Sequence, residues 1–348
     1  MKTLIKNGLL IDPANQVQAY LNLILEDGKV VAVTEEEPEA DRVIDATGKV
    51  VAPGFIDIHM HEDPVKDGKI EFCIFDAMLR MGVTTAVGGN CGINVYDPVK
   101  YLDMVEKDGA PVNVMLFAGH QYFREAAGAL DKYAPVTKEQ QEHMKKGLEK
   151  ALEAGCVGIS YGLRYVPGTG RDEFLDTASC CEKEHRMISA HVRDDEDRVF
   201  GAVAEVAEAG KLYNIPVQVS HIGSMAGFGQ MKQLLRQVDG YRMNGIDVAC
   251  DCYPYFAFST RIGATTYDDG WLERYHCDYS ACQLTEGKYK GQRCTPETFA
   301  EMRRDFPECL TVCYVMDEND IRMAFADPGV MVGSDGQPVL SQDSFQSL

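Results

Sequence analysis

The stretch VVAPGFIDIHMHE, residues 50–62, decides how the rest of the chain is interpreted. Pro53 and Gly54 interrupt the chain, and the apolar residues that follow them favour a β-strand. Side chains alternate between the two faces of a strand, so His59 and His61 would point the same way, about 6–7 Å apart. Two imidazoles in this arrangement suit a divalent metal ion. Two ordinary loop histidines are the alternative, and only partners from elsewhere in the chain can decide between the two interpretations.

The composition limits the classes of function. The chain has 348 residues, which is enough for one large α/β barrel or for two ordinary domains. Its 34 basic and 54 acidic side chains give a net charge of −20, which argues against binding to nucleic acids or to anionic membrane surfaces. No apolar run is long enough for a signal peptide or a membrane-spanning helix. We therefore expect a cytoplasmic protein whose twelve cysteines are free thiols.

From residue 53 the pattern alternates between strands and helices. Segment 137–154 is typical of a helix, because Thr137 can cap its start and Gly155 can end it. A doubly wound open sheet is the competing fold, but no GxGxxG follows the first strand of the series. We predict a (β/α)8 TIM barrel over residues 53–336. Its predicted strands are 54–60, 84–90, 112–118, 157–161, 187–191, 216–221, 247–251 and 330–334.

Three segments lie outside this alternation. Residues 1–52 show short strands separated by tight turns, which indicates part of a small β-domain of the sandwich type. An insertion at about 257–325 interrupts the barrel before its last strand and contains a ninth strand candidate at 310–315. Residues 337–348 form a short irregular tail with no helical or strand pattern.

Polar residues follow the predicted strands at their carboxyl ends, where a barrel carries its chemistry. Glycines on both sides of Cys91 let the backbone approach a ligand closely, and a thiolate is a strong zinc donor. The chain has eight histidines, and four of them lie at these strand ends. Four histidines at these strand ends are stronger evidence for a metal site than any one of them alone. The candidate metal ligands are His59, His61, Cys91, His191, His221 and Asp335.

These residues resemble the motifs of the amidohydrolase superfamily, and more narrowly those of the D-aminoacylases, the N-acyl-D-amino-acid deacylases. The likeness runs from residue 3 to about residue 336. Many other superfamily members place a carboxylated lysine at the fourth strand, whereas segment 157–161 contains no lysine, which favours bridging by a cysteine instead. The matching segments are APGFIDIHMHED (52–63), GNCG (89–92), GLRYVPG (162–168), HVR (191–193), VSH (219–221), DCYPY (251–255) and GSDG (333–336).

The resemblance implies a metal-dependent amidohydrolase that acts on linear amide C–N bonds. It implies zinc-dependent hydrolysis of N-acyl-D-amino acids, small-molecule substrates that yield a carboxylate and a D-amino acid. One zinc ion would be held tightly by Cys91, His191 and His221, and a second, weaker position would use His59, His61 and Asp335. Asp335 would then act as general base and acid. The candidates for binding the substrate are Tyr165, Arg193, Tyr255 and Arg261.

Two departures from the family pattern leave alternatives open. Gly223 stands where the family commonly has a lysine that helps to bind the substrate carboxylate, so either an arginine takes over or the substrate differs. The family also continues well beyond the position of Gly336, so the β-domain begun by residues 1–52 would be incomplete, lacking its C-terminal strands. A cyclic-amide hydrolase of the dihydroorotase or hydantoinase kind and a truncated, inactive relative are the alternatives. A homo-oligomer is equally compatible with the sequence.

Overall fold

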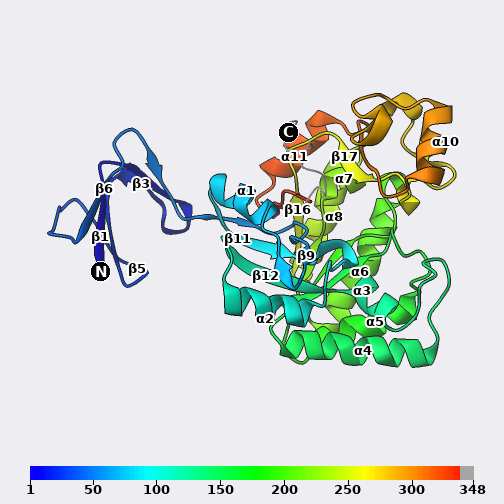
Figure 1. Ribbon diagram of the computed structural model, residues 1–348, viewed down its shortest axis with the longest axis horizontal. Coiled ribbons are helices and arrows are strands. Elements are labelled where there is room, and N and C mark those ends of the chain that lie inside the picture. Colours follow the sequence, from blue (N-terminus) through cyan, green and yellow to red (C-terminus); the bar gives the residue numbers. More distant parts are fainter. Residues whose placement is uncertain (338–348) are drawn as a thin grey trace. The chain divides into compact units, whose positions relative to one another are not determined.

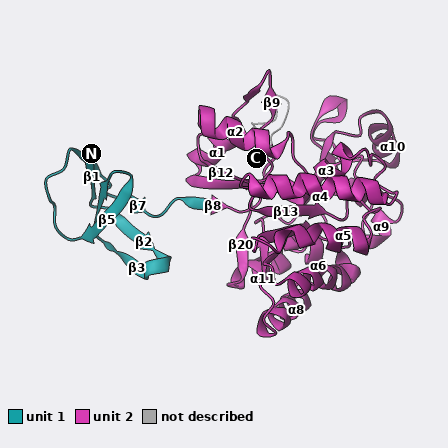
Figure 2. Ribbon diagram, turned by 90° about the horizontal axis from the view of Figure 1, so that it is seen from below, with its two compact units in different colours: residues 1–55 teal, residues 56–348 magenta. Residues whose placement is uncertain are grey.

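The computed structural model describes residues 1–337, and the remainder of the predicted tail, 338–348, lies outside the described residues. The chain divides into two compact units, Met1–Phe55 and a larger unit that begins at Ile56, which Figure 2 colours separately. The sequence prediction puts this division after residue 52. None of the described helices is both long and apolar enough to cross a membrane.

The first unit consists of two small β-sheets. One has four strands in the order β5–β4–β1–β6, and the other has three in the order β3–β2–β7. Asp27 and Gly28 both adopt positive φ between β4 and β5, as a two-residue hairpin turn requires. Sheets this small bury few apolar side chains, and Val31 and Val43 stay more than half exposed. The strands are β1 (Lys2–Lys6), β2 (Leu9–Asp12), β3 (Val17–Tyr20), β4 (Asn22–Glu26), β5 (Lys29–Thr34), β6 (Arg42–Asp45) and β7 (Val50–Val51).

Eight strands form the sheet of the second unit, and each of them overlaps one predicted barrel strand. They lie side by side in the order β8–β11–β12–β13–β14–β15–β16–β20, which is also their order along the chain. The six register pairs from β11 to β20 are parallel. The strands are β8 (Phe55–Asp57), β11 (Val83–Gly88), β12 (Asn113–Gly119), β13 (Gly158–Gly162), β14 (Met187–His191), β15 (Val217–Val219), β16 (Val248–Cys252) and β20 (Val330–Val332).

The last strand of this sheet returns to the first. Met60 and Gly336 form a parallel β-bridge, and the backbone N–H of Asp335 donates to the carbonyl of His59 at 2.8 Å. The sheet is therefore a nearly closed barrel, and the predicted (β/α)8 TIM fold is confirmed. This seam joins residues that are far apart in the chain and places two candidate ligands next to each other.

Helices between the strands cover the outside of the barrel, as Figure 1 shows for α2 to α6. The predicted helix at 137–154 is α4, and it begins with a capping box in which Thr137 and Gln140 exchange hydrogen bonds. The helices of this layer are α1 (Ile74–Arg80), α2 (Pro98–Asp108), α3 (His120–Ala126), α4 (Lys138–Glu153), α5 (Arg171–Ala178), α6 (Val199–Tyr213), α7 (Ile222–Ala226), α8 (Met231–Met243) and α11 (Glu318–Ala326). A short hairpin, β9 (Val65–Lys66) and β10 (Lys69–Ile70), precedes α1.

The insertion between β16 and α11 builds a sheet of its own, yellow to orange in Figure 1. Its three strands are antiparallel and follow the order β17–β19–β18. The predicted ninth strand is β19, the middle strand of this sheet, and is not part of the barrel. The buried rings of Tyr267, Trp271 and Phe299 pack beneath the sheet with centroids 5.1–5.5 Å apart. The elements are β17 (Phe258–Arg261), α9 (Trp271–Arg274), β18 (Cys282–Leu284), α10 (Pro296–Asp305) and β19 (Leu310–Cys313).

Candidate metal centre

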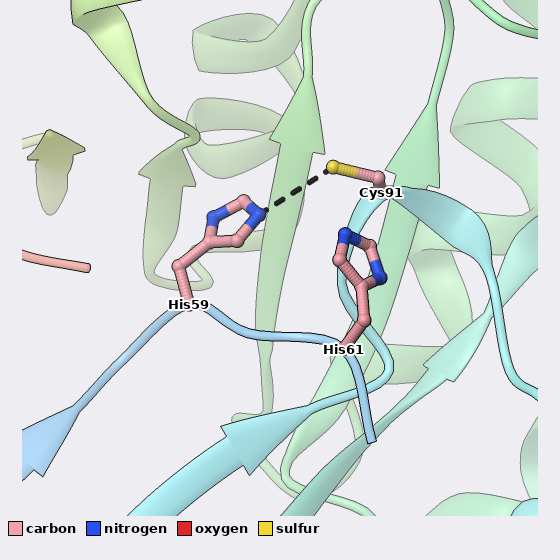
Figure 3. Close-up of side chains that lie close together, drawn as sticks. All are labelled: His59, His61 and Cys91. Atoms are coloured by element: carbon pink, nitrogen blue, oxygen red, sulfur yellow. Dashed lines mark hydrogen bonds between the residues drawn. The ribbon is translucent and has the colours of Figure 1, made fainter. Parts of the chain in front are cut away.

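The structure brings all six predicted ligands together at the carboxyl ends of the barrel strands. Their donor atoms form three trios, and within each trio every atom lies within 4.8 Å of the others. Figure 3 shows His59, His61 and Cys91 facing one another across the first two strand ends. The trios are His59–His61–Cys91, Cys91–His191–His221 and His59–His221–Asp335. Residues from both ends of the barrel sequence thus reach one point.

Cys91 lies at the centre of this cluster. Its sulfur is 3.5 Å from Nε2 of His59 and 3.4 Å from Nε2 of His221. On the other side, Oδ1 of Asp335 is 3.5 Å from Nε2 of His59 and 3.3 Å from Nε2 of His61. The side chain of Asp335 is 18% exposed, whereas that of His59 is fully buried. The thiol of Cys91 therefore faces the imidazoles of both His59 and His221. The carboxylate of Asp335 borders the solvent-facing side of the cluster.

The local backbone is unusual at three of the ligands. Cys91, His221 and Asp335 all have positive φ, at 55°, 34° and 52°. Non-glycine residues rarely adopt this region, and such strain is found where surrounding structure holds a functional side chain in place. The turn that carries Cys91 depends on Gly89, whose φ is 73° and where a Cβ atom would lie 2.3 Å from the carbonyl oxygen of Phe117.

We expect Gly89→Ala to lower the free energy of unfolding by about 1–3 kcal/mol and to weaken metal binding, because the new methyl group forces the Cys91 turn away from β12. Urea unfolding and metal analysis of the purified variant measure both effects. Gly170→Ala is the matched control, since a Cβ atom there meets nothing within 4 Å and φ is −75°. Equal stability of the two variants would contradict the assigned role of Gly89.

Two buried carboxylates hold the ligands in position. Asp251, on β16, pairs with Nδ1 of His59 at 3.2 Å and accepts the backbone N–H of His221 at 2.8 Å. Glu62 accepts the backbone N–H of Gly89 at 2.7 Å and so fixes the turn before Cys91. Neither role was predicted from the sequence. The available signal was the position of Asp251 at the end of the predicted strand 247–251, where its carboxylate can contact a ligand on a neighbouring strand.

We expect Asp251→Asn to weaken metal binding by about 10–100-fold, because the variant loses the anionic partner that orients the His59 ring. Competition with a chelator measures the affinity. Asp269→Asn is the control, because Asp269 is exposed. Unchanged metal affinity in Asp251→Asn would show that Asp251 has no positioning role.

The electrostatics of the cluster favour the ligand form of Cys91, His191 and Asp335. Burial would lower the pKa values of His59, His61 and His221, but neighbouring acidic groups raise them overall, to about 9 for His61, so His61 must lose a proton when it binds a metal. Burial opposes ionisation of Cys91, but the charges of His59 and His221 bring the pKa of its thiol well below the usual value. Burial and the neighbouring His221 lower the pKa of His191 to about 4, so this imidazole is neutral near pH 7. Burial would raise the pKa of Asp335, but a hydrogen bond from His61 and the charge of His59 lower it overall. A thiolate, a neutral imidazole and a carboxylate are the forms that bind metals.

One further observation fits a bound cation. Nδ1 of His191 is buried and has no hydrogen-bond partner among the described residues. A buried nitrogen lone pair without a partner is costly unless something binds there. The mixture of one sulfur, several imidazole nitrogens and one carboxylate is the donor set that divalent transition metals use. The residues present therefore fit a metal ion.

Comparison with known proteins shows the family of this chain. The sequence pattern of the Amidohydrolase family matches residues 42–162. An N-acyl-D-glutamate deacylase from Alcaligenes xylosoxydans xylosoxydans is 30% identical over 363 residues, covering 96% of this chain and 73% of the relative. This chain belongs to the N-acyl-D-amino-acid deacylases of the amidohydrolase superfamily. As a member of this family it is a metal-dependent hydrolase of linear amide bonds.

Solved structures lead to the same family. The crystal structure of N-acyl-D-glutamate deacylase from Bordetella bronchiseptica, in complex with zinc and a phosphonate inhibitor, has a TM-score of 0.82 and 28% identity. It aligns with 96% of this chain, which corresponds to 75% of that chain. The crystal structure of D-aminoacylase shares the fold with a TM-score of 0.83 at 24% identity, covering 96% of this chain and 75% of that one.

A small cleft lies beside the cluster of candidate metal ligands and includes three of them, His191, His221 and Asp335. Barrel residues form one wall, and residues of the insertion form the other. Tyr165, a predicted substrate-binding residue, lines the cleft and places its ring 4.4 Å from that of His191. The barrel wall includes Tyr165, His191, His221, Ser224, Tyr253 and Asp335, and the insertion contributes Phe258, Ser259, Thr260, Thr266 and Tyr275.

The structure does not bring the other predicted substrate-binding residues to this cleft. Arg193 makes two hydrogen bonds with the carboxylate of Glu205 on α6, at 2.8 and 2.9 Å. Arg261 is exposed, pairs with Glu308 at 3.1 Å and lines a different hollow. Tyr255 is 57% exposed and lies beyond the strand end, while the neighbouring Tyr253 lines the cleft. Sequence proximity to a motif did not reveal which way these side chains point.

Gly223 has a steric explanation. A Cβ atom at this position would lie 2.8 Å from Cδ1 of Ile321, 2.9 Å from Sγ of Cys252 and 3.2 Å from the terminal methyl of Met316. The segment around α11 therefore occupies the space that any longer side chain would need. No lysine or arginine lines the cleft among the described residues. The departure from the family pattern is thus built into the packing of this chain.

Proposed function

We propose that this chain hydrolyses the amide bond of N-acyl-D-amino acids with zinc as its metal, releasing a carboxylate and a free D-amino acid. The observation that supports this most is the convergence of Cys91 with four histidines beside Asp335 at the mouth of the barrel. A donor set of one thiolate and several imidazoles favours zinc over magnesium or calcium, which prefer oxygen ligands. A small-molecule substrate follows from the family, while a cytoplasmic location and self-association stay predictions.

The tight position would be held by Cys91, His191 and His221, and a weaker one by His59, His61 and Asp335. When bound, zinc would supply Lewis acidity, which polarises a carbonyl and lowers the pKa of water towards about 7. Asp251 keeps the His59 ring in its orientation through Nδ1. Cys91 can serve both positions, because its sulfur faces His59 and His221 at nearly equal distances.

Asp335 is the proposed general base and acid. Its lowered pKa keeps the carboxylate ionised near neutral pH, so it can accept a proton from the attacking water. The same carboxyl group then donates that proton to the leaving nitrogen. Asp335 is the partly exposed carboxylate of the cluster, at 18% for its side chain, and it lines the cleft, so a substrate can reach it. Tyr165 lines the same cleft beside His191 and is the proposed substrate contact.

The test is a substrate panel combined with metal analysis. N-acetyl derivatives of D-amino acids and their L-enantiomers are assayed beside dihydroorotate and hydantoin, with zinc measured on the same preparation. We expect bound zinc, release of D-amino acids and little reaction with the L-series. Opening of the cyclic amides without cleavage of the linear ones would favour the cyclic-amide alternative. Zinc binding without any turnover would support an inactive relative.

A further inference from the structure

Three cysteines of the insertion stand opposite one another across neighbouring strands. β18 pairs with β19 so that Cys282 lies opposite Cys313. The bridge between Gln283 and Arg293, together with the 2.8 Å bond from the N–H of Cys294 to the carbonyl of Cys282, places Cys294 on the other side of Cys282. All three side chains are buried, with at most 3% exposed. Opposed residues share a face of the sheet, so the thiols form a row, Cys294–Cys282–Cys313, called here the thiol row.

The hydrogen-bond pattern shows which kind of ladder position Cys282 and Cys313 occupy. The N–H of Tyr314 donates to Ala281 at 2.9 Å, and that of Thr285 donates to Leu310 at 3.2 Å. Because hydrogen-bonded pairs alternate along an antiparallel ladder, Cys282 and Cys313 occupy a non-hydrogen-bonded position. Cα atoms at such a position are about 4.5 Å apart, within the 4.4–6.8 Å range that disulfides span. The pair is therefore suited to a disulfide without a change of register.

The chemistry of the row singles out Cys282 as the reactive thiol. The thiols of Cys294 and Cys313 both hydrogen-bond to the sulfur of Cys282 and lower the pKa of its thiol. Cys282 is thus the most nucleophilic sulfur of the three. The backbones that carry the outer two thiols lie two strand spacings apart, about 9–10 Å, which does not favour one metal ion held by all three. Among the described residues, the groups able to hold a metal do not include this row.

We propose that the thiol row is an oxidation site at which Cys282 and Cys313 form a disulfide, and that this bond weakens substrate binding. The oxidant is a hydroperoxide, represented by hydrogen peroxide, which is small enough to enter a packed sheet. The Cys282 sulfur attacks the O–O bond and becomes a sulfenic acid while one water leaves. The Cys313 thiol then attacks that sulfur, the S–S bond forms and a second water leaves. Two thiols are oxidised as one peroxide is reduced to two waters.

The row is connected to the cleft through β17. Phe258 lies opposite Cys313 on β19, so its ring continues the row on the same face and lines the cleft. The hydroxyl of Tyr267 lies 3.5 Å from the sulfur of Cys282, and its ring centroid is 6.1 Å from that of Phe258. An S–S bond is about 2.05 Å long, so the two sulfurs must approach each other within a close-packed interior. Phe258 and its neighbours Ser259 and Thr260 shift with them, while the metal ligands on the barrel do not.

The bond itself is tested without any substrate, so this part of the test is independent of the proposed function. The zinc-loaded wild-type chain is exposed to hydrogen peroxide, its remaining thiols are alkylated, and the digest is mapped by mass spectrometry. We expect a peptide that links Cys282 with Cys313 and disappears after treatment with dithiothreitol. Recovery of both cysteines in alkylated form, or a link between Cys282 and Cys294 instead, would overturn the proposal.

The effect on the cleft is tested by kinetics with a cleaved N-acyl-D-amino acid, and this part rests on the proposed function. Peroxide should raise KM of the wild type by about threefold or more with little change in kcat, and dithiothreitol should reverse the change. Cys294→Ser should respond in the same way, whereas Cys313→Ser should not respond. An equal loss of activity in Cys313→Ser would place the damage at Cys91 or elsewhere and would overturn the coupling. If Cys313→Ser does not fold, the wild-type KM compared before and after dithiothreitol, with the peptide map, still decides.

Discussion

Asp335→Asn should abolish turnover while leaving the tightly bound zinc in place. The amide cannot accept a proton from water, so we expect kcat to fall by about 10²–10⁴-fold. The proposed tight position does not include Asp335, because Cys91, His191 and His221 form a trio of their own. Zinc per chain, measured by elemental analysis on the same sample as the rate, separates loss of chemistry from loss of metal.

The exposed Asp269→Asn is the control for a change of charge. A variant at position 335 that keeps full activity would remove Asp335 from the role of base. A variant that loses all zinc would show instead that Asp335 is needed for the tight position.

Cys91→Ala should remove bound metal altogether. The sulfur faces both sets of imidazoles, so its loss affects the tight and the weak positions together, and zinc per chain should fall to near zero after dialysis. Activity should fall with it. The variant also leaves several buried imidazoles without a shared partner, so its free energy of unfolding should be lower by a few kcal/mol, about 2–4. Metal analysis and urea unfolding measure these quantities.

Cys277→Ala is the matched control, because it removes a partly buried thiol that belongs to none of the ligand trios. Stoichiometric zinc in the Cys91 variant would mean that the histidines bind metal without the sulfur. In that case Cys91 would be one ligand among several and no longer the centre of the site.

The barrel and its ligands could be predicted from the sequence because both depend on local rules. Alternation along one strand placed His59 and His61 on the same side, and the common direction of parallel strands placed Cys91, His191 and His221 at one end. The position of Asp335 followed from the same rule applied to the last strand. None of this required knowledge of how side chains pack.

The residues around the ligands could not be predicted in the same way. Whether Arg193 turns to the cleft or to Glu205 depends on which partner the neighbouring helix offers, and the sequence around Arg193 does not contain that information. Arg261 lies in an insertion whose sheet is formed by pairing with a strand about fifty residues away, so its direction depends on a non-local register. Asp251 was missed because its role is to position other residues: it contacts the imidazole of His59 rather than the metal position itself.

The seam between β8 and β20 has a consequence for how the enzyme is made. His59 and Asp335 meet at this seam, where Met60 bridges to Gly336 and the N–H of Asp335 donates to the carbonyl of His59. Contacts between such distant parts of a chain form late, because the intervening loop must close first. We therefore expect the proposed weak metal position, which needs both His59 and Asp335, to be completed only when the barrel closes. We also expect a metal ion bound at the proposed weak position to link the first and last strands of the barrel and so to stabilise its closure.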